Sequence, residues 1–171
     1  MSICLNLSQN VSIIISKPCH LRSDGTYAII AGVYRVVLDT NILVSALRSR
    51  EGASNRLFAQ LGSGRFQHVY SNPLIHEYED VLLRPEMLPH LSSAALNEIL
   101  DFVCQTGEFR PIYFLVRPFL KDPKDEHLLE LAVNGQCSHI VTYNLRDFRG
   151  SDQYGVEVIK PHSFLDLLNQ S

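Results

Sequence analysis

The chain has 171 residues, of which 46% are apolar and 19% charged, with a net charge of −3 and a pI of about 6.1. These values are typical of one globular domain and exclude a disordered chain. They also exclude an overall basic field for nucleic acid, and no apolar run approaches the roughly 20 residues of a membrane span.

Residues 1–32 show no helical period, so they are predicted to form an N-terminal extension of a domain at 33–171. From residue 33 onward, strands and helices alternate. Strands are predicted at 33–39, 66–71, 110–116, 138–143 and 156–160. Helices are predicted at 40–48, 55–62, 74–84, 95–105, 124–134 and 161–168.

Capping residues support several of the helix starts. Ser54 and Asp122 suit the N-caps of the second and fifth helices, and Ser92 or Ser93 suits that of the fourth. Strands that alternate with helices of this length imply right-handed crossovers and a parallel sheet covered on both faces. The sequence therefore predicts an α/β fold with three α/β/α layers.

Asp39 ends the first predicted strand, at the edge of the sheet where ligands of parallel sheets bind. It has two interpretations, a functional carboxylate or a cap of the next helix. Glu77 lies on the apolar face of its helix, three residues after Leu74 and four before Val81. Such a carboxylate is costly unless it is paired, and the alternative is that Glu77 reaches water at the edge of that face.

Asp125 also lies on an inward helical face, three residues before Leu128. Its alternative role is structural, because Asp122 as N-cap would place Asp125 in the first turn, where it complements the helix dipole. His127 lies off this face and is a weak candidate for a ligand. Converging carboxylates repel one another, and Mg²⁺ or Mn²⁺ bound by carboxylates and water is the usual remedy.

Five ordered blocks of the sequence resemble the PIN domain family, and most of all the VapC-like toxins of bacterial toxin–antitoxin pairs. The blocks are VVLDTNILVSAL, SNPLIHEYEDVLLRPEM, DPKDEHLLELAV, SHIVTYNLRDF and VEVIKPHSFLDLL. The resemblance covers residues 33–168. It implies a ribonuclease with an α/β/α fold that depends on Mg²⁺ or Mn²⁺ and hydrolyses RNA phosphodiester bonds.

The resemblance also implies roles for individual residues. Asp39, Glu77 and Asp125 match the family's catalytic metal ligands. Asn41 and Thr142 match polar residues that orient water or the phosphate of the substrate.

The sequence departs from the family pattern at the fourth acid, whose place is taken by Asn144. Asparagine keeps an oxygen ligand but loses the charge, so a second metal ion should bind more weakly. Asp147, three residues later, either supplies the missing charge as a metal ligand or only caps a short turn. Arg48, Arg50 and Arg56 either grip the RNA backbone or are solvated surface charges.

The resemblance further implies a small antitoxin protein as partner and a homodimer. A cytoplasmic location is expected, because the four scattered cysteines favour reduced thiols and the N-terminus lacks the basic region of a signal peptide. Since Asn144 lowers the charge of the site, an alternative function stays open. The same fold would then be a catalytically weakened module that binds RNA or protein.

Overall fold

The computed structural model describes residues 33–170, so the predicted extension at 1–32 lies outside the described residues. One parallel sheet contains β1 (Tyr34–Leu38), β2 (Phe66–Tyr70), β3 (Glu108–Phe109), β4 (His139–Val141) and β5 (Glu157–Ile159). The helices are α1 (Thr40–Arg48), α2 (Ala53–Phe58), α3 (Asn72–Leu82), α4 (Ser93–Thr106), α5 (Glu126–Asn134) and α6 (Pro161–Gln170). A 3-10 turn, η1 (Ser151–Tyr154), precedes β5.

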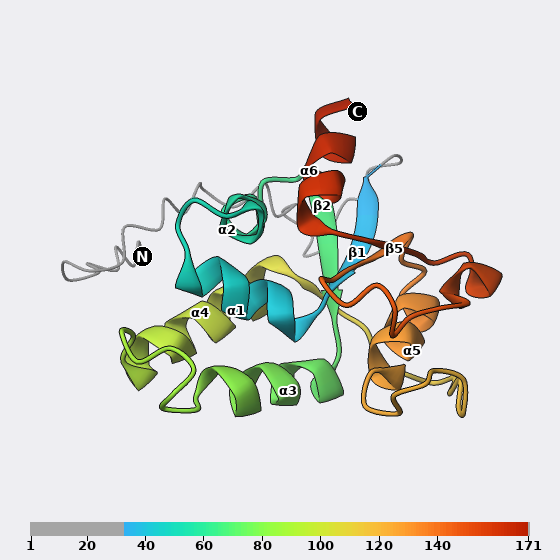
Figure 1. Cartoon of the computed structure of the whole chain (residues 1–171), viewed down its shortest axis with the longest axis horizontal. Helices are drawn as coiled ribbons and strands as arrows, with labels where there is room; N and C mark the ends of the chain where they lie inside the picture. The colour runs from blue at the N-terminus through green and yellow to red at the C-terminus, as the bar shows by residue number, and fades with distance from the viewer. Residues whose placement is uncertain (1–32, 171) are drawn as a thin grey trace, which may run out of the picture.

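The strand order is β3-β2-β1-β4-β5, with β1 in the middle of the sheet. Figure 1 shows α1, α2, α3 and α4 on one side of β1 and β2, and α5 on the other. The predicted three-layer α/β/α architecture is therefore confirmed. The chain passes from β1 to β2 in one direction and from β3 to β4 in the opposite one. This reversal creates a topological switch point between β1 and β4, where ligands of open parallel sheets bind.

The central strand is apolar because both of its faces are covered. Val36, Val37 and Leu38 are buried, and β1 pairs with β2 on one side and β4 on the other. Directly behind β1, α1 buries Ile42 and Leu43 in the same core. Among residues 33–170, no helix has both the length and the apolar character of a membrane span.

The predicted start of the second helix was wrong. Gly52 is the N-cap and α2 begins at Ala53, so Ser54 lies inside the helix rather than before it. Ser54 is fully buried and its hydroxyl lies 2.9 Å from the Tyr143 hydroxyl. Its side chain is thus engaged by a residue 89 positions away, which a local capping rule cannot reveal.

The predicted strand at 110–116 was also wrong, because the third strand is only Glu108–Phe109. Beyond it, the amides of Tyr113 and Phe114 donate to Asn134 Oδ1 at 2.9 and 3.0 Å instead of to a neighbouring strand. Both aromatic side chains are exposed. Their β-like composition therefore belongs to a loop held by the end of α5.

The fifth helix begins later than predicted. Asp122 makes a short turn in which its Oδ1 accepts from the Lys124 amide at 3.0 Å, and α5 starts at Glu126. Asp125 occupies the N-cap position without a side-chain capping bond. The predicted cap at Asp122 and the first-turn position of Asp125 were therefore wrong, which leaves the Asp125 carboxylate available for other contacts.

Candidate active site

Asp39 follows β1 and is held in one orientation by two neighbouring residues. It is the N-cap of α1, and its Oδ1 accepts from the Asn41 amide at 3.2 Å. The capping interpretation is therefore correct, but it uses only one oxygen. Oδ2 accepts from Asn41 Nδ2 at 2.7 Å and from the Thr142 hydroxyl at 2.5 Å. Burial raises the pKa of Asp39, although the bonds from Thr142 and Asn41 oppose that shift.

Thr142 follows β4 and links the two sides of the switch point. Its buried hydroxyl donates to Asp39 and accepts from Asn41 Nδ2 at 3.1 Å and from the Asn144 amide at 2.9 Å. A hydroxyl has one proton and two lone pairs, so this one is fully used. The structure thus shows Asn41 and Thr142 positioning Asp39, while their contact with substrate stays a prediction.

Glu77, on α3, reaches the same edge of the sheet. Its Oε1 accepts from the Thr40 hydroxyl at 2.6 Å, and its Oε2 lies 2.9 Å from His127 Nε2. Burial raises the pKa of Glu77, but the contacts with His127 and Thr40 outweigh it and lower the pKa overall. With 34% of its side chain exposed, Glu77 is both paired and in reach of water.

Sequence reasoning treated His127 only as a weak candidate for a ligand and did not predict its contact with Glu77. Its Nδ1 lies 2.7 Å from the Lys124 carbonyl oxygen, which only accepts, so Nδ1 carries a proton and Nε2 faces Glu77. Burial lowers the pKa of His127, but the Glu77 carboxylate outweighs this effect and raises it. The pair joins α3 to α5 across 50 residues, so only tertiary packing reveals it.

Asp125, just before α5, is the acid whose pKa reports the charge of the whole site. Burial is the largest cause and raises the pKa of Asp125. The negative charges of Asp39, Asp122, Asp147 and Glu77 raise it further, to about 6. The three predicted acids therefore share one electrostatic neighbourhood at the carboxyl edge of the sheet. Asp122 and Asp147 lie close enough to contribute to it.

Asn144 and Asp147 belong to the turn that follows β4. The exposed Asn144 accepts at its carbonyl from the Asp147 amide at 3.1 Å, which closes the turn. Asp147 is half-buried, and its charge acts on Asp125. The turn thus brings a further acid toward the site, and the assignment of Asp147 as a metal ligand stays a prediction.

The carboxylates of the site are the kind of ligand that a hard divalent cation prefers, although they are not yet arranged around one ion position. Between residues 33 and 170, no three His, Cys, Asp or Glu side chains already surround one ion position. The available donors are carboxylate oxygens, which Mg²⁺ and Mn²⁺ prefer. Burial is the largest cause of the raised pKa of Asp125, and repulsion from the neighbouring acids adds to it; a bound cation would relieve that repulsion. Glu77 would have to give up its contact with His127 in order to bind such a cation.

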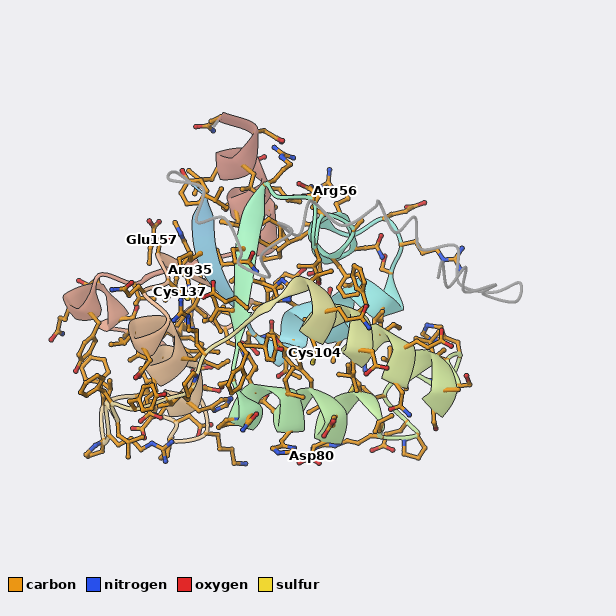
Figure 2. All side chains as sticks on the ribbon, turned by 180° about the vertical axis from the view of Figure 1, so that it is seen from behind. Arg35, Arg56, Asp80, Cys104, Cys137 and Glu157 are labelled. Carbon is orange, nitrogen blue, oxygen red and sulfur yellow. The ribbon has the colours of Figure 1, made fainter. Side chains whose placement is uncertain are left out.

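Two of the arginines that follow β1, Arg48 and Arg56, are directed away from this site. Arg48 points its guanidinium at Met87, with 3.0 Å to the sulfur. Figure 2 shows Arg56 on α2, on the opposite side of the molecule from α3, where Asp80 is labelled. The solvated-surface interpretation is therefore favoured for both residues.

We expect Asp125→Asn to stabilise the metal-free protein at pH 7 and not at pH 4. The folded-state pKa of about 6 exceeds the ordinary 3.8, so stability is lost as pH rises from about 4 to about 6. A fully buried carboxyl would lose about 3 kcal/mol, and solvent at the half-exposed Asp125 reduces this to about 1 kcal/mol. Urea unfolding of both proteins in EDTA at the two pH values measures the difference. An equal effect at pH 4 and pH 7 would contradict the expectation.

Residues 35–146 match a protein family described as PIN domain. The match extends from β1 through the turn after β4, and it includes Asp39, Glu77, Asp125, Thr142 and Asn144. No curated protein matches the chain. PIN domains are a superfamily of nucleases that generally use divalent metals, so the match supports a nuclease function. Because it covers most of the sequence, the chain belongs to the PIN domain family.

Proposed function

We propose that the chain is a Mg²⁺- or Mn²⁺-dependent ribonuclease that hydrolyses RNA phosphodiester bonds. The observation that carries this proposal is the Asp39 carboxylate, oriented by Thr142 and Asn41 beside Asp125 and Glu77. Burial and the neighbouring acids together raise the pKa of Asp125 to about 6, so this arrangement is unfavourable for the fold alone. A function that needs a divalent cation accounts for their placement.

The acidic and the polar residues of the site have different roles in this reaction. Asp39, Glu77 and Asp125 would hold the cation, which would supply charge neutralisation at the phosphate and a water molecule of lowered pKa. Thr142 and Asn41 hold Asp39 in position, and their three hydrogen bonds favour its charged form against burial, which raises its pKa. The reaction is a direct hydrolysis, in which water attacks phosphorus and no covalent intermediate forms.

Cleavage of an end-labelled RNA in Mn²⁺, compared with the same reaction in EDTA, tests this function. Cleavage in Mn²⁺ but not in EDTA would support it. The cleavage rate of a single-stranded DNA of equal sequence would then measure the preference for RNA. RNA binding without cleavage in either condition would contradict it. That result would favour the RNA-binding module instead.

We further propose that this ribonuclease is the toxin of a toxin–antitoxin pair, forms a homodimer and is covered by a small antitoxin. The resemblance of the ordered sequence blocks to VapC-like toxins supports this role. Expression of the chain alone in a bacterium should slow growth, and Asp39→Asn should relieve the effect at equal protein levels. Equal growth with both forms would contradict the toxin role and leave the nuclease proposal intact.

We expect Asn144→Asp to tighten Mn²⁺ binding by about tenfold, which corresponds to about 1.4 kcal/mol. The exposed Asn144 lies directly beside Thr142, so a carboxylate there adds charge to the cation site. Calorimetric titration with Mn²⁺ measures the change, and cleavage at low Mn²⁺ should rise with it. Asp147→Asn is the companion variant, and it should weaken binding if Asp147 supplies the fourth charge. Unchanged affinity in both variants would show that three acids suffice.

A further inference from the structure

Tyr143 lies beside the candidate active site with its polar end turned inward. Its amide donates to Asn41 Oδ1 at 3.3 Å, and Asn41 in turn donates to Asp39, so its backbone is two hydrogen bonds from that carboxylate. The Tyr143 hydroxyl lies 2.9 Å from Ser54 Oγ and 3.5 Å from Ser45 Oγ. The residue nevertheless remains 42% exposed.

This orientation reverses the usual placement of a tyrosine. Tyrosine is amphipathic and normally packs its ring against apolar groups while its hydroxyl points to water. Here the fully buried Ser54 lies within hydrogen-bond distance of the hydroxyl, although 42% of Tyr143 is exposed. None of the ring contacts among residues 33–170 involves Tyr143. The ring is thus fixed at both ends and presented to solvent.

The charge around Tyr143 restricts what its ring can bind. Asp39, Glu77 and Asp125 make this edge of the sheet acidic, and the whole chain carries a net charge of −3. Arg48 is directed at Met87, so it does not supply a phosphate contact beside the ring. A nucleobase is neutral and planar, and its stacking on an aromatic side chain depends little on which base it is.

We propose that Tyr143 is the platform on which one unpaired base of the RNA stacks, next to the phosphate that is cleaved. The proposal rests on the ribonuclease function proposed above and deepens it by assigning a base-binding residue beside the site of cleavage. Bases in an RNA duplex have their faces covered by their neighbours, so they offer no face to Tyr143. A base held on Tyr143 sets the position of the strand relative to Asp39 and adds affinity that does not depend on charge.

The chain contains no tryptophan, so Tyr143→Trp introduces a single tryptophan whose fluorescence reports on this position. We combine it with Asp39→Asn to prevent cleavage, and titrate with a single-stranded oligonucleotide and with a duplex of the same sequence in Mn²⁺. Tyr113→Trp is the matched control, because Tyr113 is 78% exposed and its amide is bound by Asn134 at the far end of α5. Single-stranded RNA is expected to quench the tryptophan fluorescence at position 143 in a saturable manner, and the duplex is not. Equal quenching at both positions would overturn the proposal.

Cleavage kinetics test the same proposal in the active protein. Tyr143→Ala is expected to lower kcat/KM for single-stranded RNA by about tenfold to a hundredfold, whereas Tyr143→Phe keeps the ring and loses less. Tyr113→Ala should cleave like the native protein. Removing the base of one nucleotide beside the cleaved bond should harm the native protein and leave Tyr143→Ala unchanged. Normal cleavage by Tyr143→Ala would overturn the stacking proposal alone, whereas absence of cleavage by the native protein would overturn the ribonuclease function with it.

Discussion

Replacing Asp39 with asparagine is expected to abolish RNA cleavage while the domain stays folded. Asp39 lies at the switch point and is 7% exposed, and Glu77 and Asp125 are within electrostatic reach of it. Loss of its charge removes several kcal/mol of transition-state stabilisation, so the rate should fall by about a thousandfold or more. The domain should stay folded, because the neutral side chain avoids the cost of a buried charge and thereby offsets the loss of the bonds from Thr142 and Asn41 Nδ2, which an amide NH2 group cannot accept. Asparagine is also as good an N-cap as aspartate.

Asp80→Asn is the matched control for this experiment. Asp80 is exposed on α3, away from the contacts that hold Asp39, and Figure 2 shows it at the outer edge of the molecule. The same chemical change there should leave both the cleavage rate and the thermal midpoint unchanged. Rates with labelled RNA in Mn²⁺ and melting curves followed by circular dichroism measure both effects. Cleavage by a folded Asp39→Asn protein at the native rate would remove Asp39 from the mechanism.

Local sequence signals were sufficient for the elements that position Asp39. The strand predicted at 33–39 is Tyr34–Leu38, and the helix predicted at 40–48 is Thr40–Arg48. Both depend on neighbouring residues alone, since an apolar run marks a strand buried on two faces and Asp39 caps the helix that follows. The placement of Asp39 at the carboxyl edge then followed from the alternation of strands and helices.

Local signals failed where a helix packs against a segment without regular structure. Glu126 and Glu130 on α5 are almost completely buried. Glu130 accepts from the Val116 amide at 3.1 Å and from Arg117 at 2.8 and 2.9 Å, and Glu126 accepts from the Phe119 amide at 2.8 Å. Backbone amides of a loop have no sequence signature. The two buried glutamates therefore bind the loop that follows the wrongly predicted strand at 110–116.

The same limit applies to the site itself. That Asp39 and Asp125 approach each other was predictable, because strand ends and helix starts meet at the same edge of a parallel sheet. The contact between Glu77 and His127 was not, since it depends on how α3 and α5 pack. The inward hydroxyl of Tyr143 also depends on packing, through Ser54 of α2.

Replacing Thr142 with valine is expected to lower the cleavage rate more than any other substitution of a residue that is not a predicted metal ligand. Valine has nearly the same shape but removes the donor to Asp39 and the acceptor for the side chain of Asn41 and the amide of Asn144. Because Thr142 is fully buried, the unsatisfied groups should cost about 2 kcal/mol of unfolding free energy. The cleavage rate should fall by about a hundredfold, since a misaligned catalytic group costs that much.

Thr142→Ser separates the hydroxyl from the bulk of the side chain, because it keeps the three hydrogen bonds and removes only a methyl group. It should stay within about 1 kcal/mol of the native stability and retain most of the activity. The pH dependence supplies the second readout. The Thr142 hydroxyl lowers the pKa of Asp39, so its loss raises that pKa, and the rate should begin to rise with pH at a higher value in Thr142→Val than in Thr142→Ser. Identical pH profiles for the two variants would mean that Thr142 supports the fold without tuning Asp39.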